Sequence, residues 1–402
     1  MSTPTNRVFW RFAVLFFVIA GCTGVLFRAG MLGVDLFGLS LQNVRHAHSH
    51  LMFFGWAGLI PFLVANNNLN DGFAHTSNRL QSLALWAIVI LSPITFVFFL
   101  MWGYHPVAFG SANLPLAAIA SSFVMIAWYL FAIGYWRSKK ESTNEYHSWF
   151  SVALLMLIVS SFGAWGVGVL QFVEVQNVLL PKALTHFFLG TFTEGWVVLV
   201  IIGIIVHAMD LKPEVFRISQ GTIMTLIAIG APLSFAYGLP SSMLSLELLW
   251  SARIGGLISS IGLLAFIYGA FKSNTLSNSI WKWPIILLAI KALFRLIISV
   301  FPNEIWLSDH NLRVLYLHIL LLGAFTLTGF GWICQRYQIN HKIYLGMVIS
   351  CLVVLVSLIL PTNLIPVTMK GIWIFQSMTA VAALPVISAI WYLILMWKSA
   401  RN

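Results

Sequence analysis

The sequence predicts an all-α, polytopic membrane protein with about twelve transmembrane helices. The chain has 402 residues, of which 60% are hydrophobic and 8% are charged, and its mean hydropathy is +0.91. Soluble domains carry about 25% charged residues, so this composition excludes that class for most of the chain. Apolar runs of about 20 residues, long enough to cross a bilayer as helices, recur throughout. No connection between them reaches the length of a folded domain, and we expect residues 1–402 to form one integral membrane domain.

The apolar runs give the order of the elements. The expected spans cover residues 8–30, 44–66, 81–103, 115–136, 148–171, 184–208, 220–239, 252–272, 281–301, 312–334, 343–362 and 374–397. The first lacks a cleavage signature, so we expect it to be retained as a span. The fourth, seventh and eleventh are the least regular, because Pro115, Pro232, Pro240 and Pro361 lie in or beside them and proline disrupts a helix.

Basic residues predict the orientation of these spans. The formal net charge is +11, and most Lys and Arg residues lie at the termini and in the even-numbered connections. By the positive-inside rule, both termini should face the cytoplasm, and we expect a multi-pass protein of the bacterial inner membrane. Because the charges are spread over short loops, they indicate topology and a lipid bilayer as partner, with no nucleic-acid surface.

The second span carries three histidines in its first turns: His46, His48 and His50. Imidazoles in apolar helices need a partner, and haem or a metal ion is a strong candidate. At about 100° per residue, His46 and His50 share one face while His48 points almost the opposite way. Either His48 is the ligand, or the His46 and His50 pair is the ligand set and His48 is supported elsewhere.

Three further histidines fall at the same depth. His186 lies in the outer part of the sixth span, and His310 and His318 lie in the tenth. His310 sits at the water boundary, whereas His318 is deep enough that an unpaired ring would be costly. The remaining histidines, among them His75 and His341, lie in or near loops and are interpreted as ordinary surface residues.

Three charged residues lie deep in predicted spans. Glu194 is the only carboxylate well inside a span, which favours a proton carrier or a metal ligand over a purely structural role. Lys291 and Arg295 lie one turn apart on one face of the ninth span. They need an anion, either haem propionates or Glu194, unless Arg295 reaches outward to the membrane surface.

Arginines near the outer ends of the spans are a further candidate group. Arg45 and Arg313 are placed to bind haem propionates through the guanidinium fork, although ordinary topology residues have the same distribution. Cys22, Cys334 and Cys351 are isolated and form no CxxCH sequence. Any haem would therefore be held by axial ligands and packing alone.

Three stretches resemble subunit I of the haem-copper oxidase superfamily, especially its C-type oxidase and nitric oxide reductase branches. The stretch Arg45-x-x-His48, followed by SHLMFFGWAG, resembles the helix-two pattern there, and residues 48–56 are also similar to a motif of the NnrS family. The tenth span matches at His318 with Gly323, and the sixth resembles the reductases at His186 and Glu194. The resemblance implies haem b with His48 and His318 as axial ligands. It also implies a second site for copper or non-haem iron at His186.

The chain departs from the superfamily at two places. Residues 220–239 contain no histidine, and Tyr316 stands at the position of the high-spin haem ligand. The oxygen-reducing centre of the superfamily is therefore incomplete here. His46, His50 or His310, with Glu194, would have to complete any second metal site.

These observations predict a divergent membrane haem b protein engaged in electron transfer or in handling nitric oxide or oxygen. If it is an enzyme, it is an oxidoreductase related to nitric oxide reductase or terminal oxidase subunit I. An electron-donor protein or quinol and a small gas ligand are the partners this function implies. The alternatives are a haem-free, proton-coupled transporter or permease, and a haem-based sensor or assembly factor without catalysis.

Overall fold

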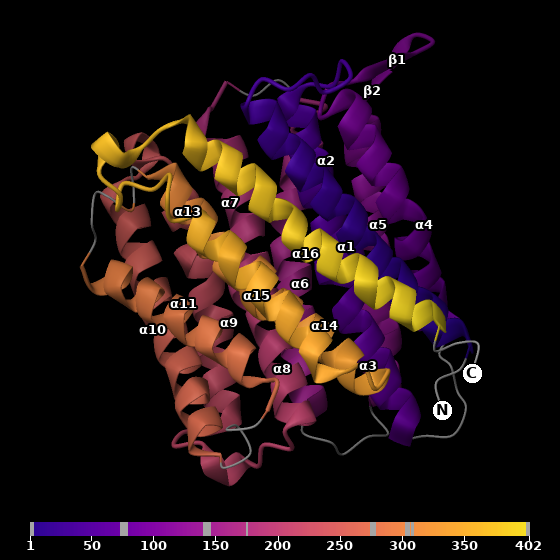
Figure 1. Cartoon of the computed structure of the whole chain (residues 1–402), viewed down its shortest axis with the longest axis vertical. Coiled ribbons are helices and arrows are strands. Elements are labelled where there is room, and N and C mark those ends of the chain that lie inside the picture. The colour runs from indigo at the N-terminus through magenta and orange to yellow at the C-terminus, as the bar shows by residue number, and fades with distance from the viewer. Residues whose placement is uncertain are drawn as a thin grey trace. The chain divides into compact units, whose positions relative to one another are not determined.

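The computed structural model describes residues 4–72, 79–139, 146–173, 176–273, 279–301, 306 and 309–398. Within these ranges, eleven helices are long and apolar enough to cross a membrane, and the apolar helix His341–Ser357 is shorter. The predicted all-α, multi-pass membrane fold is therefore confirmed. The chain divides into two compact units, so a single integral domain stays a prediction. Figure 1 labels the α-helices and the two strands.

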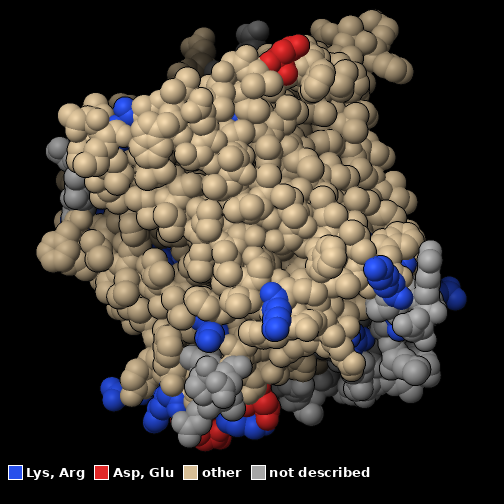
Figure 2. Space-filling model, viewed as in Figure 1, with Lys and Arg blue, Asp and Glu red and all other residues tan. Residues whose placement is uncertain are grey.

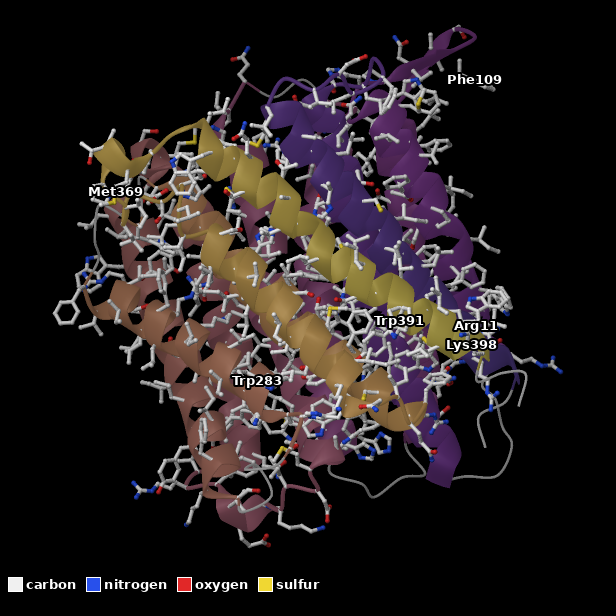
Figure 3. The ribbon with its side chains drawn as sticks, viewed as in Figure 1. Arg11, Phe109, Trp283, Met369, Trp391 and Lys398 are labelled. Carbon is white, nitrogen blue, oxygen red and sulfur yellow. The ribbon has the colours of Figure 1, made fainter. Side chains whose placement is uncertain are left out.

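The first unit comprises residues 1–142, 334–357 and 369–402. Its elements are α1 (Pro4–Met31), α2 (Leu41–Leu51), η1 (Met52–Gly58), α3 (Leu59–Gly72), α4 (Arg79–Trp102), β1 (Val107–Phe109), β2 (Ala112–Leu114), α5 (Leu116–Lys139), α15 (His341–Ser357) and α16 (Ile372–Lys398). Helix α1 packs against both α2 and α16, although α1 and α16 stand at opposite ends of the sequence. Arg11 contributes to this pairing, since its Nη2 donates to the Met396 carbonyl at 3.0 Å and its guanidinium lies 4.5 Å from the Trp397 ring centre. Figure 3 labels Arg11 and also Lys398, the last residue of α16.

A two-stranded antiparallel hairpin is the only sheet among the described residues. It joins α4 to α5, and Phe109 is exposed at its turn (Figures 1 and 3). Gly110 has φ +62°, a left-handed conformation that glycine adopts without strain. Pro115 follows this hairpin and precedes α5, so the fourth span keeps an uninterrupted helix.

The second unit comprises residues 143–333 and 358–368. Its main elements are α6 (Tyr146–Val169), α7 (Leu179–Gly190), η2 (Thr191–Val197), α8 (Val198–Ala208), α9 (Gln220–Leu233), η4 (Ser234–Gly238), α10 (Leu246–Lys272), α11 (Lys282–Val300), α13 (His310–His318), η6 (Ile319–Phe325) and α14 (Thr326–Arg336). Helices α9 and α10 pack so closely that a Cβ on Gly230 would lie 2.5 Å from the Gly255 carbonyl oxygen. Pro232 lies in the last turn of α9, which ends at Leu233, and the chain then continues as the 3₁₀ segment η4.

The exposed surface has the composition expected of spans that face lipid. Many large apolar side chains are exposed along α4, α10 and α16, including Ile90, Ile254 and Trp391. On the face shown in Figure 2, uncharged residues predominate. The lipid bilayer is therefore the natural environment of these helices.

Candidate functional site

The three spans that carry the candidate histidines are also the most buried of the described candidate spans. In the second, sixth and tenth spans, 78%, 89% and 72% of the most apolar stretch is buried, against 56% or less in every other candidate span of the described chain. A residue in these spans faces protein more often than lipid. Polar side chains there consequently need partners within the protein or from a bound group.

Each of these spans contains a seven-residue π-helical segment close to a histidine. The segments η1, η2 and η6 begin within five residues after His50, His186 and His318, respectively. They are the only π-helical segments among the described residues. Because a π turn strains the helix, such segments are rare and frequently mark functional sites.

Packing differs on the two sides of the π segment in the sixth span. Helix α7, which carries His186, has no buried residue, whereas every residue of η2 and most of α8 are buried. Helix α2 is similar to α7, since only Val44, Ala47 and Leu51 are buried there. His48, His186 and His318 are all partly exposed. The imidazoles therefore lie in the less tightly packed halves of their spans.

His48 faces α1 within the first unit. Its Nδ1 lies 2.7 Å from the Ala20 carbonyl oxygen, and because a carbonyl only accepts, Nδ1 carries the proton. The neutral ring then has its lone pair on Nε2, the arrangement common in metal-ligating histidines. Gly24 lies against the ring, and a Cβ there would be 2.9 Å from His48 Cε1. The small residues of α1 thus fix the position and the tautomer of His48.

His46 and His50 face the other side, as their spacing predicts. Their ring centres are 6.3 Å apart, and His50 stacks on Phe99 at 3.6 Å. His50 Nδ1 donates to the His46 carbonyl at 2.8 Å, while its Nε2 lies 3.3 Å from the Tyr104 hydroxyl. Burial raises the pKa of Tyr104 to about 12, so its hydroxyl stays protonated and can donate to Nε2. Both nitrogens of His50 are then engaged, which favours His48 as the ligand.

His318 in the second unit has a geometry similar to that of His50. Its Nδ1 lies 2.7 Å from the carbonyl oxygen of Val314, one turn earlier on α13. This bond again places the lone pair of the neutral ring on Nε2. Helix α13 begins at a cap, because Asp309 Oδ1 accepts from the backbone N–H groups of Asn311 and Leu312.

The two candidate propionate ligands have different surroundings. Arg313 Nη1 donates to the carbonyl oxygens of Gly238 and Leu239, both at 3.1 Å. Its guanidinium thus holds the end of η4 while its other N–H groups can serve a further acceptor. Arg45 is exposed on α2. A propionate role for either arginine stays a prediction.

His186 lies next to the same end of η4. A Cβ on Gly238 would collide with the His186 ring, so only glycine fits there. Arg313 and His310 are among the groups close enough to influence His186 electrostatically. Among the residues that the structure describes, no three His, Cys, Asp or Glu side chains gather as a metal site. A second metal at His186 with His46, His50 or His310 stays a prediction, whereas Glu194 binds Lys291, Arg295 and Tyr316 instead.

Glu194 has a different set of partners within the second unit. Its Oε2 lies 2.5 Å from Lys291 Nζ, and its Oε1 lies 3.0 Å from Arg295 Nη2. The Tyr316 hydroxyl also donates to Oε1 at 3.0 Å. All four side chains are buried. Of the two anions proposed as partners of Lys291 and Arg295, the structure provides Glu194. The alternative in which Arg295 reaches outward to the membrane surface is wrong, because its side chain is buried.

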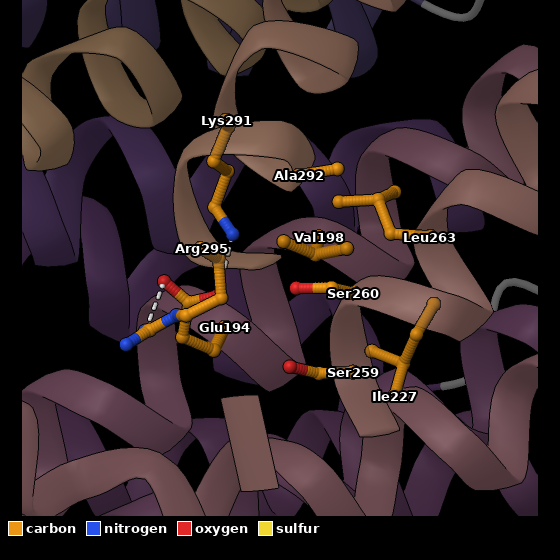
Figure 4. Close-up of a pocket in the computed structure, with 9 residues that line it drawn as sticks. All are labelled: Glu194, Val198, Ile227, Ser259, Ser260, Leu263, Lys291, Ala292 and Arg295. Carbon is orange, nitrogen blue, oxygen red and sulfur yellow. Dashed lines mark hydrogen bonds and ion pairs between the residues drawn. The ribbon is translucent and has the colours of Figure 1, made fainter. Parts of the chain in front are cut away.

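Aromatic rings and a small cavity complete this ionic cluster. The Arg295 guanidinium lies 5.1 Å from the Tyr237 ring centre and 5.0 Å from that of Tyr316, so it is held between two rings. A cavity of about 10 Å³ adjoins the cluster, and Ser259 and Ser260 on α10 line it (Figure 4). That volume suits about one water molecule.

Sequence reasoning missed several residues of these sites. Tyr316 was assigned only through the haem-ligand position that it occupies in the resemblance, yet its hydroxyl binds Glu194. Gly24 and Gly238 received no role, because a glycine that makes room for a ring from a distant segment leaves no local pattern. The apolar spacing in α11 could have identified Lys291 and Arg295 as facing inward, since their face is otherwise buried.

Comparison of the chain with protein-family models and with curated proteins finds no match.

Proposed function

We propose that the chain is a membrane haem b protein in which His48 and His318 supply the axial imidazoles. The observation that carries this proposal is the repeated arrangement of a partly exposed histidine beside a π segment in each of the three most buried spans. A purely structural role does not explain why imidazoles lie in the loosely packed half of each span. A bound planar group that contacts these partly exposed imidazoles would explain it.

The surroundings of each histidine fit an axial ligand. In both His48 and His318, a backbone carbonyl 2.7 Å from Nδ1 fixes the tautomer with the proton on Nδ1 and the lone pair on Nε2, the nitrogen that would bind iron. Arg313 and Arg45 would bind the propionates. Haem with two imidazole ligands supplies one-electron transfer, and its potential depends on the axial ligands and on burial. The chain's own residues would hold the ring, orient the imidazoles and exclude water.

The broader function that we propose is electron transfer, or the handling of nitric oxide or oxygen. A quinol or a redox protein would supply electrons, and a small gas would be the ligand. We further propose that the protein resides in the bacterial inner membrane with both termini in the cytoplasm, because Lys and Arg are concentrated in the corresponding connections.

A reduced-minus-oxidised visible spectrum of the purified protein tests the haem proposal. We expect sharp b-type bands that His48→Ala and His318→Ala each abolish. His341→Ala is the matched control, because His341 is exposed at the start of α15 and should leave the bands unchanged. A colourless protein after expression with sufficient haem would refute the proposal.

Proton-coupled transport without haem is the second candidate function. The observation that favours it is the buried cluster of Glu194, Lys291 and Arg295, because ionisable residues inside spans often line a proton or substrate path. A colourless protein that moves protons across a vesicle membrane in response to a solute gradient would support this candidate.

A further inference from the structure

The ionic cluster of the second unit carries one positive charge in excess when all its members are ionised. Glu194 contributes one negative charge, and Lys291 and Arg295 contribute one positive charge each. All three are buried, with side chains 2% to 6% exposed. An uncompensated charge in such surroundings is costly, so the cluster favours a state with one proton fewer.

The geometry identifies which residue can lose that proton. Arginine does not deprotonate in proteins, and Arg295 is held by Glu194 and by the two tyrosine rings. Glu194 accepts hydrogen bonds from Lys291, Arg295 and Tyr316, which together favour its ionised form. Lysine changes protonation state readily when buried. Lys291 is therefore the member that remains free to exchange.

We propose that Lys291 is the proton-exchanging residue of this chain, and that Glu194 and Arg295 form its fixed neutral pair. The Lys291 ammonium gives one proton to water and becomes a neutral amine whose lone pair remains on Nζ. The reverse step forms the N–H bond again. The proton exchange that we expected of Glu194 from the sequence is thereby assigned to Lys291. This assignment does not depend on haem.

The adjoining cavity supplies a place for the water that takes part. Lys291, Arg295 and Ser260 line it together with Ser259 (Figure 4). Among the described residues, Arg295 Nε and Ser260 Oγ are buried polar atoms without a hydrogen-bond partner. One water in this space could accept from Arg295 Nε and from Lys291 while it donates to Ser260, which would satisfy both atoms.

The charged and titratable groups that face Lys291 determine how readily its amine is protonated. They are Glu194 on η2, Arg295 on the same helix, and Tyr316 on α13, whose ring centre lies 5.2 Å from Lys291 Nζ. Tyr237 on η4 faces Arg295, and α10 contributes the uncharged Ser259 and Ser260. Protonation of Lys291 therefore restores a positive charge that no other residue of the cluster neutralises.

Thermal unfolding of the purified full chain as a function of pH tests the proposal. Lys291 is protonated in the unfolded chain, whereas the folded cluster favours its neutral amine. The unfolded state therefore binds more protons, and the free energy of unfolding should rise with pH. The unfolding equilibrium constant should change by up to tenfold per pH unit for this single proton. Lys291→Met should remove this component and still fold, because it leaves the neutral Glu194 and Arg295 pair.

Lys282→Met is the matched control, since Lys282 begins the same helix and its amine lies over the Trp283 ring. It should keep the pH dependence of the unchanged protein. A Lys291→Met protein with that same dependence would overturn the proposal.

Infrared spectroscopy distinguishes Lys291 from Glu194 directly. On acidification, we expect the unchanged protein and Glu194→Gln to show the same protonated-carboxyl bands, because Glu194 stays ionised. The appearance of a band that Glu194→Gln removes would assign the exchangeable proton to Glu194 and overturn the proposal. Neither measurement requires bound haem, so a failure of the haem proposal would leave both results interpretable.

Discussion

Two polar regions lie within the apolar helices, and their polar side chains offset the free-energy cost of burial in different ways. In the second unit, Glu194, Lys291 and Arg295 satisfy one another at 2.5 and 3.0 Å. In the first unit, His48 contacts a backbone carbonyl through Nδ1 and lies in a loosely packed half-span. The ionic cluster is explained largely by its own members. For the histidine region, we propose a bound group.

The largest expected effect comes from the ionic cluster. Glu194→Gln leaves the buried Arg295 guanidinium without a carboxylate and weakens the acceptor of Lys291, and we expect the free energy of unfolding to fall by about 3–5 kcal/mol. Chemical denaturation in detergent measures this loss. Glu247→Gln is the matched control, because Glu247 is exposed at the start of α10, and it should change stability by less than about 0.5 kcal/mol. Equal effects of the two substitutions would contradict the comparison.

A smaller effect is expected at the partner of His50. Tyr104→Phe removes the hydroxyl 3.3 Å from His50 Nε2 and should lower the free energy of unfolding by about 1 kcal/mol. The b-type bands should be unchanged, because His50 is not expected to ligate haem. His50→Ala tests the assignment directly, since loss of the bands in that variant would identify His50 as a ligand and reverse the assignment to His48.

The smallest net effect on stability is expected at Gly24. In Gly24→Ala, the better helix propensity of alanine, about 1 kcal/mol, opposes a Cβ that would lie 2.9 Å from His48 Cε1. We expect a net change in stability below about 1 kcal/mol, together with weakened or shifted haem bands because the ring must move. Calorimetry and visible spectra measure the two effects separately.

Gly346→Ala is the control for this substitution, since nothing lies within 4 Å of a Cβ at Gly346 on α15. It should gain helix propensity without any spectral change. Spectra of Gly24→Ala identical to those of the control would show that contact with α1 does not position a haem ligand.

The spans could be predicted from the sequence because bilayer thickness requires about 20 apolar residues for each helix. The predicted span 81–103, for example, corresponds to α4 (Arg79–Trp102). The π segments could not be predicted, since the sequence of η1, MFFGWAG, has the apolar composition of an ordinary membrane span. A π turn depends on how neighbouring helices pack, which local composition does not record.

The charged residues of the site were predicted individually, but their arrangement was not. Glu194 and Lys291 are 97 residues apart in sequence, and no periodicity relates two separate spans. Burial cost indicated that each needs a partner. Propionates and Glu194 remained equal alternatives until the structure brought Glu194 beside both cations.

The π segments also affect how the sequences of related chains should be aligned and how this chain can be engineered. A π segment accommodates one more residue than the α-helical turns it replaces, so an ordinary helical wheel drawn through η1 misplaces everything on one side of it by about 100°. Removing a single residue from such a segment would rotate His48 and His50 together around the helix axis without substituting either. Insertion and deletion are therefore as effective as substitution for redirecting the imidazoles of this protein.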